Sequence, residues 1–321
     1  MFGLRIGLAV LALVAAAPAA ALAQEWPSRP IRFIVPFPAG GSTDVAARLI
    51  GEYLSRSLGQ QVVVENKAGA NGNIAVEAAA KSTPDGYTVL VATDSVVSNP
   101  HVYKTNIDVL KDLVPIIQFS QQPIVLAAHP SLGVKSIAEL VALAKQQPGL
   151  RFATGSGVNS AQHMVALWFA QIADIKLEQV PYRGGGQAIN DLIAGHVKLG
   201  SLGSTPLVPH YQAGTLYLLA QSMRARSPAL PDVPTFEEAG IKGLVLDQWV
   251  GAFVPAGTPP AIIARLRTEM SKARADPAIR EGFSKSAQEA VTGTPEQFTR
   301  FVREEYERYE RLVAQLKLKP N

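Results

Sequence analysis

Apolar residues recur along the chain in two alternating patterns. Short runs rich in β-branched residues are typical of strands, for example residues 31–37, 87–93 and 249–255. Between such runs, apolar residues lie three or four positions apart, as in residues 45–58, which is the spacing of a helix that buries one face. Strands and helices that alternate in this way predict an α/β fold with a mainly parallel sheet.

Sequence signals for helix ends support this interpretation. Gly59 ends the helix over residues 45–58, and the capping-box sequences Ser136 to Glu139 and Thr294 to Gln297 begin two others. Thr258 is expected to cap a further helix, with Pro259 at its first position. The remaining pattern predicts strands at 61–66, 151–154, 177–182, 197–203 and 216–223, and helices from about Ser160 and Gln187. The last helix carries an aromatic stripe, which we expect to pack against a lobe.

Two segments indicate passages between two lobes. Residues 115–130 hold two consecutive β runs and end in a proline, and we place the first passage there. The return is placed at the β run 216–223, before a proline-rich loop at 226–235. We therefore predict one lobe built from residues 24–125 and 225–321, and a second lobe built from residues 126–224.

The N-terminal segment has the order of a secretory signal peptide. Arg5 is followed by an apolar run and by Ala21-Leu22-Ala23, which predicts cleavage before Gln24 and removal of residues 1–23. A membrane anchor is the alternative. No later run of 18 apolar residues occurs in the sequence. We expect a freely diffusing protein of the periplasm.

Composition narrows the chemistry. Hydrophobic residues make up 47% and charged residues 17% of 321, which is typical of a well-packed globular protein. The sequence contains no cysteine, which excludes thiol nucleophiles, Cys-ligated zinc and iron–sulfur clusters. The net charge of +4 is small and its basic residues are scattered, so we expect no nucleic-acid partner.

Motifs for catalysis and cofactors are missing from the sequence. It has no G-x-S-x-G, G-x-x-x-x-G-K-[ST], G-x-G-x-x-G or H-E-x-x-H pattern, and no histidine lies within four residues of another. We therefore expect neither a cofactor nor a metal. His163 follows a turn rich in glycine and serine. It is either a ligand contact or a helix-face histidine bonded to the backbone.

Small polar turns, most of them with glycine, recur where strands end. They occupy residues 38–43, 93–95, 154–160, 183–186 and 203–205, and Arg183 is the one basic residue within them. Helix N-termini present unpaired N–H groups and a partial positive charge, so glycine and serine there can bind an anion without Lys or Arg. Ordinary loop geometry explains any single turn, but the recurrence of such turns favours a ligand cleft.

Two of these turns share a sequence pattern. Val35-Pro-Phe-Pro-Ala-Gly-Gly-Ser42 resembles Val180-Pro-Tyr-Arg-Gly-Gly-Gly-Gln187, and one lies in each predicted lobe. The match is too short to establish a duplication. Open α/β sheets bind ligands beyond the carboxyl ends of their strands, so the pair predicts a cleft with a glycine turn on each wall.

Over essentially the whole mature chain, the sequence resembles the Bug family, the periplasmic substrate-binding proteins of tripartite tricarboxylate transporters. The resemblance lies in PSRPIRFIVPFPAGGSTDVAARLI, LGQQVVVENKAGANGNIA, PDGYTVLVAT, NPHVYKTNIDVLKDLVPI, VPYRGGGQAINDLIAGHV, LPDVPTFEEAG and W-x-G-x-x-x-PAGTPP. It implies a type II periplasmic binding protein with two lobes that close around a small carboxylated molecule in the cleft between them.

The resemblance also implies which residues bind the ligand. In the first lobe these are Phe37, Ala39, Gly40, Gly41, Ser42 and Asp44; in the second they are Thr154, Gly155, Ser156, Gly157, Ser160 and His163, with Tyr182 and Asp191 as neighbours. Ser95 and Ser204, in two further strand-end turns, complete the candidate set. Ala39, Asn159 and Gln187 depart from the family pattern, which affects the identity of the ligand and not the fold.

These observations predict a monomeric, non-enzymatic solute-binding protein. It would capture a small organic carboxylate (a di- or tricarboxylate, an amino acid or an aromatic acid) and deliver it to the membrane permease subunits of a tripartite tricarboxylate transporter. Two alternatives stay open at this stage. One is an exported enzyme that uses His163 and Asp191 as acid–base groups; the other is a protein that, when loaded, signals to a membrane receptor.

Overall fold

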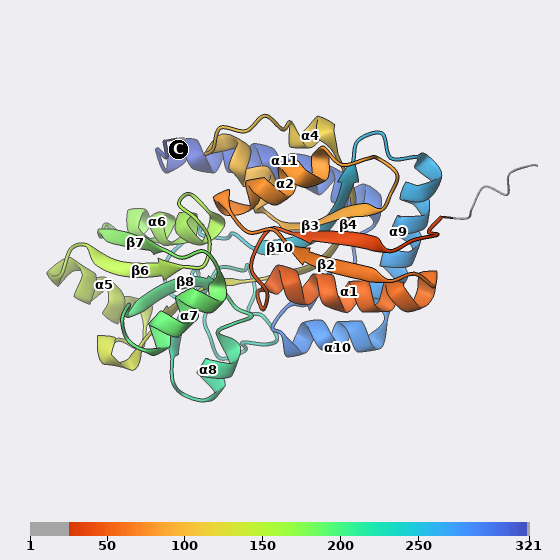
Figure 1. The fold of residues 1–321 in the computed structure, drawn as a ribbon. Coiled ribbons are helices and arrows are strands. Elements are labelled where there is room, and N and C mark those ends of the chain that lie inside the picture. Colours follow the sequence, from red (N-terminus) through yellow and green to blue (C-terminus); the bar gives the residue numbers. More distant parts are fainter. Residues whose placement is uncertain (1–25, 320–321) are drawn as a thin grey trace, which may run out of the picture.

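A computed structural model describes residues 26–319. The predicted signal peptide, residues 1–23, lies outside these residues. Two sheets, each flanked by helices, form two lobes that lie side by side (Figure 1). The type II two-lobed α/β architecture is thus confirmed. No helix between residues 26 and 319 has the length and hydropathy needed to span a membrane.

The first lobe contains a sheet with the strand order β11-β4-β10-β3-β1-β2. Its strands are β1 (Ile31–Val35), β2 (Val62–Asn66), β3 (Thr88–Thr93), β4 (Leu113–Gln122), β10 (Gln248–Pro255) and β11 (Glu289–Ala290). The second lobe has the order β7-β6-β8-β5-β9, built from β5 (Ile124–Ala128), β6 (Leu150–Thr154), β7 (Leu177–Pro181), β8 (Leu199–Gly203) and β9 (Tyr217–Gln221). The chain therefore crosses to the second lobe at Pro123 and returns between β9 and β10.

The expectation of mainly parallel sheets is wrong. β1 is parallel to β2 and β3, and β6 is parallel to β7 and β8, but β10 and β5 are antiparallel to both of their neighbours. β4 and β10 in the first sheet, and β5 and β9 in the second, are the strands next to the passages between the lobes. A single residue separates β4 in one sheet from β5 in the other, so the chain runs directly from the first lobe into the second.

Helices cover both sheets. They are α1 (Ser42–Leu58), α2 (Asn73–Ala80), α3 (Ser95–Ser98), α4 (Val109–Asp112), α5 (Ile137–Gln146), α6 (Ala161–Ala173), α7 (Gly185–Ile193), α8 (Val208–Gln212), α9 (Pro260–Ala275), α10 (Pro277–Lys285) and α11 (Pro295–Gln315). Gly59 ends α1 in the left-handed conformation, with φ 67°, as predicted. The capping box of α11 is also confirmed, because Thr294 and Gln297 each accept a hydrogen bond from the backbone N–H of the other.

Two predicted helix starts and one predicted capping box differ in detail. α9 begins at Pro260, and the Thr258 hydroxyl donates a hydrogen bond back to the Pro255 carbonyl (2.8 Å) instead of capping the helix. α7 begins at Gly185, two residues before Gln187, and therefore includes two of the three glycines of this turn. The Ser136 hydroxyl caps α5, but the Glu139 carboxylate accepts from the N–H of Lys135, one residue before the box predicts.

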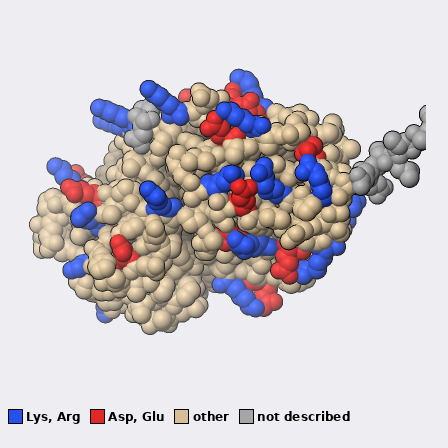
Figure 2. Space-filling model, in the orientation of Figure 1, with Lys and Arg blue, Asp and Glu red and all other residues tan. Residues whose placement is uncertain are grey.

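The C-terminal helix α11 packs its aromatic stripe against the first sheet, as predicted. The Trp249 ring lies 5.6 Å from the Phe298 ring and 5.7 Å from the Phe301 ring, measured between centroids. A Cβ atom on Gly251 would lie 2.4 Å from Phe298, so glycine is required for this close approach. Lys and Arg are interspersed with Asp and Glu on the face shown in Figure 2, with no continuous field of one sign.

Candidate functional site

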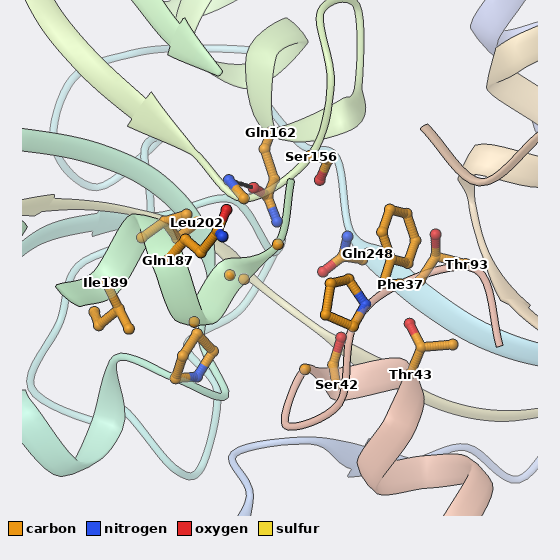
Figure 3. Close-up of a pocket in the computed structure, with 18 of the residues that line it drawn as sticks. Phe37, Ser42, Thr43, Thr93, Ser156, Gln162, Gln187, Ile189, Leu202 and Gln248 are labelled. Atoms are coloured by element: carbon orange, nitrogen blue, oxygen red, sulfur yellow. Dashed lines mark hydrogen bonds between the residues drawn. The ribbon is translucent and has the colours of Figure 1, made fainter. Parts of the chain in front are cut away.

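A cavity of about 380 Å³ lies between the two lobes (Figure 3). One wall comes from the first lobe and the other from the second. The first-lobe residues are Phe37, Pro38, Ala39, Gly41, Ser42, Thr43, Thr93, Gln122 and Gln248; those of the second are Gly155, Ser156, Gln162, Gly184, Gly185, Gly186, Gln187, Ile189, Asn190, Leu202, Gly203 and Pro206. None of these lining residues carries a charged side chain.

The turn from β1 into α1 forms the first wall. Gly40 has φ 87°, a conformation that favours glycine, and it places Gly41 at the start of the helix. No side chain caps α1 there. The first turn of a helix leaves N–H groups without intrahelical partners, and the helix dipole adds partial positive charge at this end. The start of α1 therefore offers hydrogen-bond donors to the cavity.

Asp44 holds this turn through hydrogen bonds to its backbone and does not line the cavity. Only 3% of the residue is exposed, and its carboxylate accepts hydrogen bonds from Gly40 N (3.0 Å), Arg48 Nε (2.9 Å) and Asn66 Nδ2 (3.0 Å). Burial by itself would raise the pKa of Asp44, but the hydrogen bonds from Arg48, Gly40 and Asn66 lower it. An ionised Asp44 thus fixes the path of the glycine turn.

The turn from β6 into α6 forms part of the opposite wall. Gly155 and Ser156 line the cavity, and Gly155 N donates to the side-chain oxygen of Gln162 (2.8 Å), which itself lines the cavity. Thr154 is buried and donates to the Ser156 carbonyl (2.7 Å). Ser160 caps α6 by accepting a hydrogen bond from His163 N. Thr154 and Ser160 therefore shape the turn without lining the cavity.

The start of α7 completes the second wall. Gly184 precedes this helix, again without a capping side chain. A Cβ atom on Gly155 would lie 2.6 Å from Gly185 Cα, so the two turns of this lobe pack backbone against backbone. Across the cleft, a Cβ on Gly184 would lie 3.0 Å from Pro38 Cγ. The uncapped starts of α1 and α7 consequently line the same cavity from opposite lobes.

The sequence similarity between residues 35–42 and 180–187 does not reflect equivalent places in the two sheets. β1 lies between β2 and β3, whereas β7 is the edge strand of its sheet. The strand of the second lobe that occupies the place of β1 is β6, between β7 and β8. Both glycine turns nevertheless line the cavity, as the sequence predicts.

Gln122 and Gln248 form a polar pair at the passage between the lobes. Gln122 Nε2 donates to Gln248 Oε1 (2.7 Å), while Gln122 Oε1 accepts from the N–H (3.2 Å) and the hydroxyl (2.7 Å) of Thr205 in the second lobe. A Cβ atom on Gly203 would lie 2.7 Å from both Gln122 Nε2 and Gln248 Oε1. Sequence reasoning missed Gln122, Gln162 and Gln248. For Gln248 the available signal was a polar residue at the start of an otherwise apolar strand.

A second cavity, of about 450 Å³, adjoins the first. The two share Phe37 and Ser156, and the second is also lined by residues 68–72, Tyr103, Gly157, Val158 and residues 181–183. Two predicted site residues, Gly157 and Tyr182, thus line the second cavity and not the first. Arg183 is the charged residue among those that line it.

His163 and Asp191 are not placed as an acid–base pair on a cavity wall. His163 is 9% exposed, its Nδ1 accepts a hydrogen bond from Asn159 N (2.9 Å), and burial lowers its pKa to about 4. Asp191 accepts a hydrogen bond from the Tyr182 hydroxyl (2.6 Å). Burial and this carboxylate raise the pKa of Tyr182 to about 12. Neither His163 nor Asp191 lines either of the two cavities described above.

Ser95 and Ser204 are also buried away from the cavity. Ser95 accepts a hydrogen bond from the Thr93 hydroxyl (3.1 Å), and Thr93 itself lines the cavity. Ser204 donates to the Ala287 carbonyl (2.9 Å), which joins the second lobe to the first. Within residues 26–319 there is no group of three or more His, Cys, Asp or Glu side chains arranged to hold a metal ion.

Comparison with known proteins identifies a matching family and similar proteins. Residues 46–318 match the family described as the tripartite tricarboxylate transporter family receptor, TctC. Protein BugT of Bordetella pertussis is 36% identical over 313 residues, which cover 97% of this chain and 95% of BugT.

Solved structures of similar proteins include complexes with organic acids. An R. palustris protein with adipate has a TM-score of 0.88 and 32% identity, covering 92% of this chain and 100% of that one. MatC from Rhodopseudomonas palustris with bound malate has a TM-score of 0.82 and 28% identity, covering 89% and 99%. The periplasmic binding protein BugD has a TM-score of 0.87 and 29% identity, covering 92% and 100%.

Proposed function

The chain belongs to the tripartite tricarboxylate transporter receptor family of periplasmic solute-binding proteins, and from this membership we propose that it captures a small organic carboxylate between its lobes. The observation that carries the proposal is the meeting of the uncapped starts of α1 and α7 in one uncharged cavity. Unpaired N–H groups at such helix starts bind anions without a basic side chain. The relatives bound to adipate and malate support a carboxylate as the anion.

The cavity suits a small acid with an apolar part. Its volume, about 380 Å³, lies within the range of small-molecule sites. We assign the ligand carboxylate to the N–H groups and hydroxyls of the first turn of α1 and to the start of α7. Phe37, Ile189 and Leu202 would contact the carbon skeleton. A longer skeleton would extend past Phe37 and Ser156 into the second cavity.

Closure of the lobes would bury the ligand. Several hydrogen bonds join the lobes: the Tyr103 hydroxyl donates to the Val158 carbonyl (2.5 Å), Asn159 Nδ2 donates to the Lys319 carbonyl (3.2 Å), and Ser204 donates to the Ala287 carbonyl (2.9 Å). Hinge closure around a ligand also changes the surface that a partner sees. We propose that the loaded monomer presents this surface to the membrane permease subunits of a tripartite tricarboxylate transporter, after export by a cleaved signal peptide.

We further propose that the protein is not an enzyme. The separate surroundings of His163 and Asp191 support this, because a general base must reach the proton that it removes from a bound substrate. We expect His163→Ala to retain ligand binding. Incubation of the protein with a bound acid, followed by NMR, is expected to show no product. Turnover that is lost in His163→Ala would favour the exported enzyme.

Calorimetric titration tests the carboxylate proposal directly. Adipate, malate, citrate, glutamate and benzoate are titrated against the purified mature protein, with the neutral diamide of adipic acid as the matched control. We expect at least one acid to bind and the diamide not to bind, because the helix starts stabilise negative charge. Absence of binding across the acids, or equal binding of adipate and its diamide, would contradict the proposal.

A further inference from the structure

A buried carboxylic acid lies directly behind the wall of the binding cavity. Asp94 follows Thr93, which lines the cavity, and precedes the short helix α3. Only 2% of Asp94 is exposed, and its Oδ1 has no hydrogen-bond partner among the described residues. A buried carboxylate that is not fully hydrogen-bonded is costly, so this group calls for an explanation.

Gln248 connects Asp94 to the cavity. Thr205 donates two hydrogen bonds to Gln122 Oε1, so the orientation of the Gln122 carboxamide is fixed and its Nε2 donates to Gln248 Oε1. Gln248 Nε2 is thereby left for other acceptors. This carboxamide stabilises the anionic form of Asp94 and lines the cavity. Thr205, Gln122, Gln248 and Asp94 thus form a polar path from the second lobe to the interior of the first.

The surroundings of Asp94 contain an excess of acid. From α11, Glu305 and Tyr309 act on its carboxyl, and Arg308 pairs with Glu305 (2.9 Å). Burial, followed by Glu305, raises the pKa of Asp94 to about 7. A second buried acid, Asp247, also has a raised pKa, of about 6, and burial is the main cause. The charges of Glu305 and Glu289 raise this pKa further, and those of Arg308 and Arg224 lower it.

We propose that Asp94 is a positioning residue of the cavity, which takes up a proton when an anion binds beside Thr93 and Gln248. The inference rests on the proposed capture of a carboxylate. A ligand carboxylate and an ionised Asp94 would compete for the donors of the Gln248 side chain and would repel each other. Like charges that share a site favour protonation of one of them. The proton comes from solvent and stays on the Asp94 carboxyl, which frees Gln248 Nε2 for the ligand.

Affinity for the anion should fall as the pH rises. Binding raises the affinity of Asp94 for a proton, so the protonated protein binds the anion more tightly. Affinity is then greatest below the pKa of free Asp94, about 7, and falls as the pH rises above it. If binding raises this pKa by one unit, the Kd increases about sixfold between pH 6.5 and 8.5. The ordinary carboxylates of the ligand stay ionised over this range.

Calorimetry on the mature protein tests the proposal with adipate and malate as probes. Titration at pH 7.5 in imidazole and in Tris, two cationic buffers whose ionisation enthalpies differ, measures protons taken up per ligand. We expect uptake of a fraction of one proton in the wild-type protein and none in Asp94→Asn, whose Kd should not change from pH 6.5 to 8.5. The matched control Asp247→Asn removes another buried carboxyl of the cluster and should retain the uptake. Glu305→Gln should move the rise in Kd to lower pH.

The possible failures are distinguishable. If no organic acid binds, the proposed function is wrong. If adipate or malate binds to the wild-type protein without proton uptake, the proposal for Asp94 is wrong even though carboxylate capture stands. Uptake that persists unchanged in Asp94→Asn would likewise overturn the assignment. The wild-type measurement decides the proposal even if Asp94→Asn does not fold.

Discussion

Replacement of Gly184 by alanine tests whether contact between the two glycine turns closes the cavity. Gly184 has φ −168°, an extended conformation that any residue adopts, so alanine introduces no backbone strain. Its Cβ would lie 3.0 Å from Cγ and 3.1 Å from Cδ of Pro38 in the other lobe. The added methyl group therefore opposes approach of the lobes and leaves the packing within each lobe unchanged.

The size of the effect follows from the contact. Adding a methyl group to a well-packed contact costs about 1–3 kcal/mol when the neighbours cannot move. In the ligand-free protein the lobes can separate and relieve the contact, but the closed complex cannot. We expect Kd to rise about 5- to 150-fold, because each 1.4 kcal/mol is a factor of ten. The thermal unfolding midpoint without ligand should change little.

A double-mutant cycle checks this reasoning. The tightest-binding acid is titrated against the wild-type protein, Gly184→Ala, Pro38→Ala and the double variant. Pro38→Ala removes Cγ and Cδ, the atoms that the new methyl group would meet, so Gly184→Ala should cost much less affinity in that background. If Gly184→Ala binds as the wild-type protein does, or if its cost is the same with and without Pro38, the contact does not control closure.

Three further predictions concern residues around the cavity. Gly41→Val should abolish binding, measured by calorimetry, because the valine side chain would enter the cavity. The thermal midpoint should change little, because the φ of Gly41, −81°, suits any residue and the nearest atom to a new Cβ is 3.8 Å away. Asp44→Ala should lower the free energy of unfolding in urea by about 2–3 kcal/mol, since it removes charged hydrogen bonds to Gly40 and Arg48. Burial lowers the pKa of His163 to about 4, so the stability that neutral His163 contributes is lost as the pH falls from about 6.5 toward 4, at up to about 1.4 kcal/mol per pH unit. In urea denaturation at a series of pH values, His163→Asn should make the free energy of unfolding depend less on pH in this range. An unchanged pH dependence would show that His163 is not the group responsible.

Much of the local structure was predictable from the sequence. The strand over β1, the end of α1 at Gly59 and the capping box at Thr294 each depend on residues within a few positions of one another. Periodic burial, the left-handed angles of glycine and cap hydrogen bonds are local causes, so a sequence pattern carries them. The family resemblance, confirmed by the match over residues 46–318, supplied the two-lobed arrangement.

The sequence also indicated part of the cavity wall. Phe37, Ala39, Gly41 and Ser42 line the cavity from the first lobe, and Gly155 and Ser156 line it from the second. Residues such as Asp44 and Thr154 belong to the same turns but lie beneath the surface of the cavity, where they hold the backbone. A turn motif in the sequence identifies the lining residues and the supporting residues alike. Which of its side chains faces a ligand depends on packing against the rest of the lobe.

Only the tertiary structure decided the remaining features. Gln122 meets Gln248 across 126 positions of sequence, and Glu305 of the C-terminal helix helps burial to raise the pKa of Asp94. The antiparallel half of each sheet arises where the chain passes between lobes, which no local pattern records. The sequence determined the elements and the glycine turns because these depend on neighbouring residues. The cavity, its polar pair and its buried acid depend on which distant segments pack together, and that is a property of the folded chain.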